Sequence, residues 1–298
     1  MPITQALLTS GSGTNASVFT PASITPSANK LIKVSVTSVR FAAPPAAPTI
    51  SGNSITYVQI RSIALGNWQR LTVFRAMGSP TSGSPTITFG ATQDSCDWVF
   101  GEFGGVDTSG SNGSGAVRQD NEASVSNSES VEVPLGAFGA AGNATAGAFL
   151  LSSAPANIIP GSGFTEIADL GELQTEWRVD NDQTVDVTWV GSRNAVGVAI
   201  EIKQATTVLE IFPAGFGIET VGGPLLVQSA AGFLTLQGRT DLNGQLVLEV
   251  PAGTYAVQMH TQRHVLAPAS QQVEVVDAQE TAVTIAMPAA IRRRRPWA

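Results

Sequence analysis

The amino-acid sequence predicts an all-β protein built from two β-sandwich domains. Hydrophobic residues make up 43% of the chain and charged residues only 13%, with 30 Gly and 17 Pro. Such a composition favours short strands joined by turns over helices with salt-bridged faces. Apolar and polar residues also alternate in many short β-branched segments, and no helical period is sustained. The alternation ends at Lys203 and starts afresh after it, which predicts a domain boundary there.

In the N-terminal part, residues 1–20 are rich in Gly, Ser and Asn, and we expect them to form an arm. Residues 30–40 then alternate as a strand does, a Pro/Ala loop follows, and residues 55–63 and 69–77 repeat the alternation around a turn that contains Trp68. Further strands are expected at 84–90, 96–103, 129–138, 146–153, 175–180, 185–191 and 195–203. About ten strands with turn signals between them predict a jelly-roll-like β-sandwich over residues 21–204.

The C-terminal domain is expected at residues 205–288, where about seven short strands fit a small immunoglobulin-like sandwich. Asn243-Gly244 suits a type I′ hairpin turn, and Pro251 and Gly253 suit a second turn that opens the next strand. Residues 289–298 are left as a basic tail.

This C-terminal segment resembles a known module. Gly238 to Gly244, then Leu246 and Leu248, then Val250 to Tyr255 look like the carboxypeptidase-regulatory-like (transthyretin-like) β-sandwich. The resemblance implies a spacer, an adhesion unit or a carbohydrate-contacting unit, of the kind also appended to phage structural proteins, and not a peptidase.

A weaker resemblance covers the N-terminal domain. Residues 67–78, 86–90 and 96–117 are similar to a recurring jelly-roll domain of bacteriophage virion proteins. That resemblance implies no catalytic residues.

Charge and cysteine content narrow the classes of function. The net charge is −7, and four of the sixteen basic residues are Arg292 to Arg295, so the rest of the chain is more acidic still and should repel nucleic acid. Cys96 is the only cysteine, so packing and not an intrachain disulfide must hold the fold. We expect Cys96 to be a small buried residue beside Trp98.

The expected cellular location rests on two features of the sequence. Residues 1–20 have neither the basic start nor the apolar core of a secretory signal, and the apolar stretch 146–161 is broken by Ser, Asn and Pro, so membrane insertion is not expected. The composition nevertheless resembles that of extracellular β proteins. A virion protein, made in the host cytoplasm and exposed on the particle, reconciles the two.

The candidates for catalysis are few. Nucleophilic catalysis needs an imidazole, but the only histidines, His260 and His264, lie in the small C-terminal domain. Their four-residue spacing would suit a metal pair on a helix and not on a strand and loop, so we expect surface positions and no metal site.

Acidic residues leave three alternatives open, and two of them need exposed aromatic rings. The first is a polysaccharide depolymerase, which would pair two carboxylates. The second is glycan binding without hydrolysis, which would use the aromatic rings alone. The third, which we favour, places Trp68, Trp98, Trp177 and Trp189 in the core. The candidate carboxylates are Asp97, Glu102, Glu172, Glu176, Asp180, Asp182 and Asp186.

Two segments carry weaker hypotheses. Asp180, Asn181, Asp182 and Asp186 could bind calcium through oxygen atoms, although a plain turn is favoured. Residues 104–130 are expected to form a long Gly/Ser/Asn loop, which is either simply exposed or ordered against a neighbouring subunit.

The residues that we predict to contact other proteins lie in the C-terminal tail. They are Arg292, Arg293, Arg294, Arg295 and Trp297. Arg and Trp are favoured at interfaces, so we expect this tail, with the N-terminal arm, to dock on neighbouring subunits. The sequence thus predicts a non-enzymatic virion structural protein of the decoration or fibre type, without cofactor. Its expected partners are other capsid or tail proteins and copies of itself, and the alternative partner is a host-surface glycan.

Overall fold

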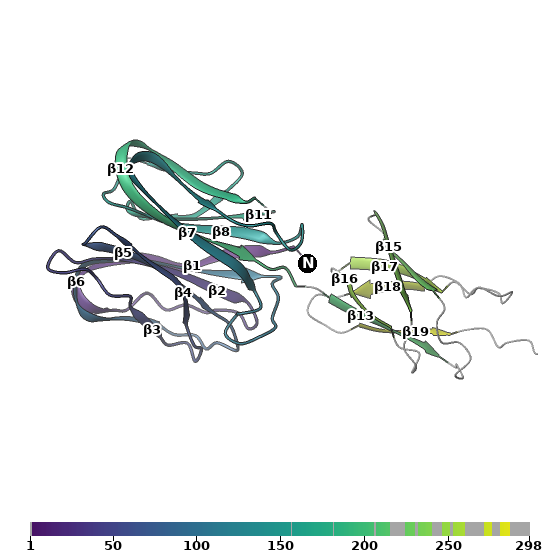
Figure 1. Ribbon diagram of the computed structural model, residues 1–298. Helices are drawn as coiled ribbons and strands as arrows, with labels where there is room; N and C mark the ends of the chain where they lie inside the picture. Colours follow the sequence, from purple (N-terminus) through teal and green to yellow (C-terminus); the bar gives the residue numbers. More distant parts are fainter. Residues whose placement is uncertain are drawn as a thin grey trace, which may run out of the picture. The chain divides into compact units, whose positions relative to one another are not determined.

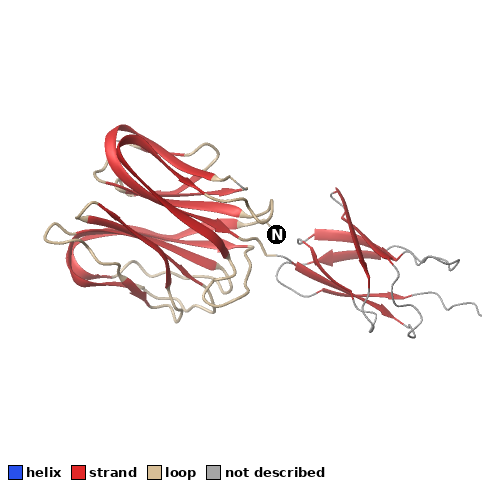
Figure 2. Ribbon diagram, in the orientation of Figure 1, coloured by secondary structure: helices blue, strands red, loops and turns tan. Residues whose placement is uncertain are grey.

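A computed structural model describes residues 2–155, 157–180 and 182–205 with their side chains, and from residue 207 onward the backbone of seven strands. The chain divides into two units, an N-terminal unit, Pro2–Gln204, and a C-terminal unit, Ala205–Ala298. All the regular secondary structure in the described residues consists of β-strands (Figure 2). The prediction of an all-β sandwich fold is therefore confirmed. None of the described residues forms a helix with the length and hydrophobicity that a membrane crossing requires.

The N-terminal unit holds two six-stranded antiparallel sheets that lie as two layers (Figure 1). The first sheet uses β1 (Thr4–Phe19), β2 (Leu31–Val39), β3 (Thr49–Ser51), β4 (Val58–Leu65), β5 (Gln69–Ala76) and β6 (Thr86–Gly104). The second uses β7 (Val117–Pro134), β8 (Ala144–Leu151), β9 (Ile158–Pro160), β10 (Thr165–Asp169), β11 (Leu173–Val179) and β12 (Thr184–Ile202). Each sheet therefore comes from one continuous stretch of chain.

The two sheets have the same topology. The first has the order β1-β6-β2-β5-β4 with β3 paired to β6, and the second has the order β7-β12-β8-β11-β10 with β9 paired to β12. Adding six to each strand number of the first sheet gives the second. The long strands β6 and β12 correspond, and both contain 19 residues. The N-terminal unit is thus an internal duplication of one sheet pattern.

The two sheets pack through corresponding faces. Leu31 and Phe103 of the first sheet share a core with Ala144 and Ile200 of the second. In the pairing with the long strand, Leu31 lies opposite Phe103 and Ala144 lies opposite Ile202, so the two strand starts occupy equivalent positions. Contact between equivalent surfaces is the geometry of a symmetric dimer, here within one chain.

Each sheet also covers its own outer face, because the long strands bend over it (Figure 1). Phe19, Ile87 and Trp98 lie in the outer core of the first sheet. Val133, Val185 and Trp189 lie in that of the second. Cys96 belongs to the same outer core as Trp98 and is buried, as the sequence predicts.

Residues 1–20 differ most from expectation. Instead of an arm, Thr4–Phe19 form β1 and pair with β6 from Thr4 to Phe19. A Cβ atom on Gly13 would lie 2.5 Å from the Phe19 ring, and one on Gly11 would lie 3.1 Å from the Trp98 ring. Glycine here lets a strand pass closely over aromatic rings, and it does not signal a free arm.

The loop expected at residues 104–130 is shorter than predicted, because β7 begins at Val117. Its side chains are largely Ser, Asn, Glu and Gln on a strand at the end of the sheet order, so their polarity concealed the alternation. The paired segments expected at 84–90 with 96–103 and at 185–191 with 195–203 are in fact the continuous strands β6 and β12.

The C-terminal unit contains β13 (Thr207–Ala214), β14 (Pro224–Ser229), β15 (Gly232–Arg239), β16 (Leu246–Val250), β17 (Gly253–Met259), β18 (Gln271–Val275) and β19 (Thr281–Ala286). They form a three-stranded sheet, β16-β13-β19, and a four-stranded sheet, β15-β14-β17-β18. Two small sheets fit the predicted immunoglobulin-like sandwich. The histidines and the tail with Arg292 to Arg295 and Trp297 lie outside the described residues.

Candidate functional site

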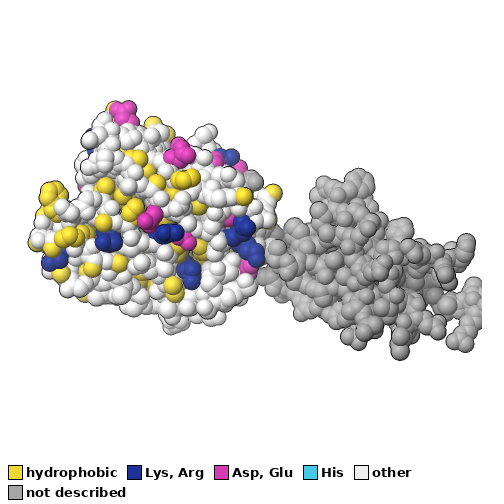
Figure 3. Space-filling view, viewed as in Figure 1, with side chains coloured by type: hydrophobic (Ala, Val, Ile, Leu, Met, Phe, Trp, Pro, Cys, Tyr) yellow, Lys and Arg dark blue, Asp and Glu magenta, His cyan; other side chains and the backbone are white. Residues whose placement is uncertain are grey.

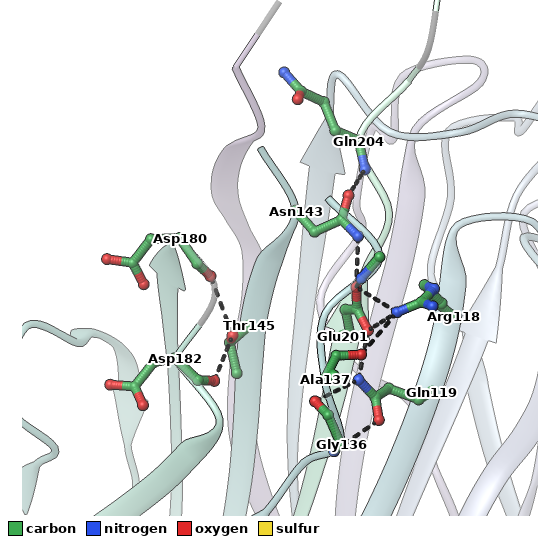
Figure 4. Close-up of polar contacts among 11 residues, drawn as sticks. Arg118, Gln119, Gly136, Ala137, Asn143, Thr145, Asp180, Asp182, Glu201 and Gln204 are labelled. Carbon is green, nitrogen blue, oxygen red and sulfur yellow. Dashed lines mark hydrogen bonds and ion pairs between the residues drawn. The ribbon is translucent and has the colours of Figure 1, made fainter. Parts of the chain in front are cut away.

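Among the residues described with their side chains, the carboxylate with the most hydrogen-bond partners is Glu201 at the end of β12, which is not one of the candidates predicted from the sequence. The side chain is fully buried and accepts hydrogen bonds from the backbone N–H of Gly139 (3.0 Å) and from the side chains of Asn143 and Gln119 (Figure 4). Arg118 completes the set with an ion pair of 3.1 Å. Burial alone would raise the pKa of Glu201, but these hydrogen bonds and the Arg118 charge lower it overall.

These contacts tie the β7–β8 loop to the end of β12. Arg118 also donates to the carbonyl of Ala137 (3.0 Å), and Asn143 accepts from the backbone N–H of Gln204 (3.0 Å). A Cβ atom on Gly139 would lie 2.5 Å from the Arg118 side chain, so Arg118 packs directly against this glycine. We call Glu201 and its partners the second clamp.

Glu102 forms the equivalent first clamp at the end of β6. It accepts the backbone N–H of Ser27 (2.9 Å) and pairs with Lys30 (2.8 Å), both in the β1–β2 loop. Glu102 lies opposite Ile32, the second residue of β2, just as Glu201 lies opposite Thr145, the second residue of β8. Burial acts to raise the pKa of Glu102, whereas Lys30 and Ser27 lower it overall. Glu102, one of the candidate carboxylates, and Glu201 thus hold equivalent loops.

The segment considered for calcium is organised around an arginine. Arg178 contacts Asp180 at 2.5 Å and Asp182 at 2.6 Å. The backbone carbonyls of these two aspartates accept the Thr145 hydroxyl, and their side chains point away from it (Figure 4). Within the described ranges, which omit Asn181, no three His, Cys, Asp or Glu side chains gather as a metal site would require.

Glu176 and Lys33 are ionisable groups buried in the sandwich. Lys33 lies between the sheets and donates to the carbonyl of Gly147 (2.9 Å) and to the Ser35 hydroxyl (3.2 Å). Burial lowers the pKa of Lys33 to about 7, although nearby Glu176 acts against this. Burial raises the pKa of Glu176 to about 8, against its hydrogen bond from the Gly161 backbone. A cavity of about 10 Å³ beside Lys33 has room for about one water molecule.

Asp97 lies on β6 of the first sheet and Glu172 immediately before β11 of the second, and the two charges influence each other. Burial, and secondly the charge of Glu172, raises the pKa of Asp97 to about 6. Each is bonded to a neighbour: Asp97 accepts from Thr37 (3.3 Å) and Glu172 accepts from Gln69 (3.1 Å). The remaining candidate, Asp186, has a raised pKa because of burial and then of Asp182 and Glu132.

The four tryptophans within the described residues divide into core and surface residues. Trp98 and Trp189 are buried, and Trp177 packs edge-on to Phe103 with ring centroids 6.0 Å apart. Trp68 is 57% exposed. The expectation of a core position is therefore wrong for Trp68, because the three-residue β4–β5 turn carries its side chain away from both sheets.

Comparisons with known proteins add little. No protein-family model and no curated protein matches the chain. Among solved structures, it is similar to the minor pilin GBS52 of Streptococcus agalactiae, with 13% identity, a TM-score of 0.26, and 49% of this chain and 82% of that one covered.

Two further structures are similar at the same level. The major pilin subunit BcpA of Bacillus cereus shows 10% identity and a TM-score of 0.25, with 86% and 99% of the two chains covered. The pilus 2b backbone protein of group B streptococcus shows 10% identity and a TM-score of 0.23, with 57% and 95% covered.

Proposed function

We propose that this protein is a non-catalytic structural component of a bacteriophage particle. It would lie on the capsid or tail surface, or within a fibre, and would act through contacts with other virion proteins and with copies of itself. The observation that carries the proposal is the pair of clamps, in which Glu102 and Glu201 hold equivalent loops. Carboxylates bonded to backbone N–H groups and cations serve a scaffold, whereas a general acid or base must exchange protons with a substrate.

Three further features support a scaffold role. The duplicated sheets make the N-terminal unit one rigid sandwich with cores on both outer faces as well as between the sheets. A second β unit follows in the same chain. The low content of charged residues is that of a surface built from hydroxyl, amide and backbone groups. The phage assignment itself rests on the resemblances carried by the sequence.

Incorporation into particles tests the proposal. Particles released from the host are purified by density gradient, with the full chain supplied or with residues 291–298 deleted. We expect the full chain to sediment with the particles and the deleted chain to remain soluble and folded, because Arg292 to Arg295 and Trp297 provide the docking contacts.

Two results would contradict the proposal. One is a full chain that never sediments with particles. The other is release of reducing ends from a polysaccharide that is lost in Asp97→Asn, since this would make Asp97 and Glu172 a catalytic pair.

A further inference from the structure

Phe41 and Trp68 form an exposed aromatic pair at one end of the N-terminal unit. Phe41 is 66% exposed and Trp68 is 57% exposed, and their rings meet edge to face with centroids 6.1 Å apart. Phe41 follows β2 and Trp68 lies in the β4–β5 turn, at the end where Val39 pairs with Gln69. Hydrophobic side chains gather at the left-hand end of this unit, where these segments lie (Figures 1 and 3).

Hydrogen bonds hold the backbone around the pair. The N–H of Arg40 donates to the carbonyl of Trp68 at 2.8 Å, and the N–H of Phe41 donates to the Asp94 carboxylate at 2.7 Å. The Pro/Ala loop that follows is anchored by Arg70, whose Nε donates to the carbonyl of Pro45 at 2.6 Å. A ligand would therefore meet rings that are already in place, and binding would cost little ordering of the protein.

The internal duplication shows that the fold does not require these rings. The corresponding segments of the second sheet are residues 152–157 after β8 and residues 170–172 between β10 and β11, and neither contains an aromatic residue. The second sheet folds on the same topology without them. The two side chains are large, apolar and mostly exposed to water, and the second sheet folds without counterparts to them. This indicates that they bind a ligand and do not serve core packing.

Size and charge identify the kind of ligand. Aromatic side chains present about 150–250 Å² each, so the pair at these exposures offers about 250 Å². A specific protein partner needs about 800 Å² on each side. Two sugar rings match the smaller area. Asp94 accepts from the Phe41 backbone and Arg40 precedes Phe41 in the chain, so the pair has one neighbour of each charge. Arg70 is occupied by Pro45 and by the Ser62 hydroxyl (3.0 Å), so the surroundings favour a neutral ligand.

We propose that Phe41 and Trp68 form a binding site for a neutral hexose polysaccharide, whose sugar rings stack on the two aromatic faces. This site is independent of the proposed particle role and goes beyond it. The polar groups around the rings, among them the second oxygen of the Asp94 carboxylate, would accept hydrogen bonds from sugar hydroxyls.

Affinity electrophoresis of the full chain tests the site. Native gels contain barley β-glucan, dextran, galactomannan, or acidic polygalacturonate as the charged comparison. We expect slower migration in at least one neutral gel, and a dissociation constant raised at least about tenfold in Trp68→Ala and in Phe41→Ala. Val190→Ala is the matched control, because Val190 is an apolar side chain that is 78% exposed and lies on β12 of the second sheet. Thermal unfolding of each variant verifies that it is folded.

Three results would overturn the proposal. The first is unchanged migration in all three neutral gels. The second is retardation that persists in both aromatic variants or occurs only with polygalacturonate. The third is concentration-dependent self-association that is lost in Trp68→Ala without any polysaccharide binding, which would assign the pair to contact with a second copy of the chain.

Discussion

Removing the Glu201 carboxylate should destabilise the N-terminal unit strongly. In Glu201→Ala, the N–H of Gly139 and the amide of Asn143 lose their acceptor, and the Asn143 side chain is buried. A buried hydrogen-bond donor left without its acceptor costs about 1–3 kcal/mol. Arg118 is 41% exposed and regains water, so its part of the ion pair counts little. The hydrogen bond from the Gly139 N–H to the charged carboxylate is lost as well, so we expect a total loss of about 3 kcal/mol in the free energy of unfolding.

Urea denaturation followed by tryptophan fluorescence measures this loss, since four of the five tryptophans, Trp68, Trp98, Trp177 and Trp189, lie in the N-terminal unit. Glu201→Gln keeps one acceptor oxygen and should cost about 1–3 kcal/mol. Glu122→Gln is the control, because Glu122 only approaches Arg61 at 3.9 Å on the surface, and it should cost less than about 1 kcal/mol. A loss in Glu201→Ala no larger than that of the control would refute the clamp.

Four further outcomes are expected. Between pH 4.5 and about 8, native Glu176 holds a proton that the unfolded chain has lost, so stability falls as pH rises through that range. Between about pH 7 and 10.5, native Lys33 lacks a proton that the unfolded chain holds, so stability rises with pH there. Urea midpoints measured against pH should pass through a minimum near neutrality, and Lys33→Met should remove the alkaline rise. The lowered pKa of Glu102 means that its contribution is lost as pH falls below its ordinary value of 4.5, and Glu102→Gln should flatten that acid limb. Gly13→Ala should cost about 1–3 kcal/mol in the same assay, because its Cβ would meet Phe19 at 2.5 Å, and an unchanged midpoint would argue against this path of β1. Burial raises the pKa of the Cys96 thiol, so a thiol reagent should label it only as fast as the unit unfolds, and rapid labelling of the native protein would contradict this.

Strands were predictable where an apolar side chain recurs at every second residue. Residues 30–40 and 69–77 alternate clearly and form β2 and β5 within one or two residues. Residues 1–20 and 117–130 were missed for different reasons: close packing on Phe19 and Trp98 requires glycine in β1, and solvent keeps β7 polar. The local alternation of apolar and polar residues reveals neither the close packing of β1 nor the exposure of β7.

The duplication was hidden because topology and not side-chain identity is repeated. Lys33 of β2 corresponds to Ala146 of β8, and Phe103 corresponds to Ile202, so the two halves differ at equivalent core positions. One feature of the sequence could have predicted the clamps. Glu102 and Glu201 each interrupt an apolar run at the end of a strand, in Phe-Gly-Glu-Phe and Ala-Ile-Glu-Ile, where a charge must be buried and therefore paired.

Electron microscopy of the particle tests the proposed structural role most directly. Particles from the host are incubated with gold-labelled antibody fragments against the N-terminal unit and then imaged. We expect gold at regular, repeated positions on the capsid, tail or fibre. Particles that carry no gold, while the same fragments detect the protein in the soluble fraction of the lysate, would contradict the proposal.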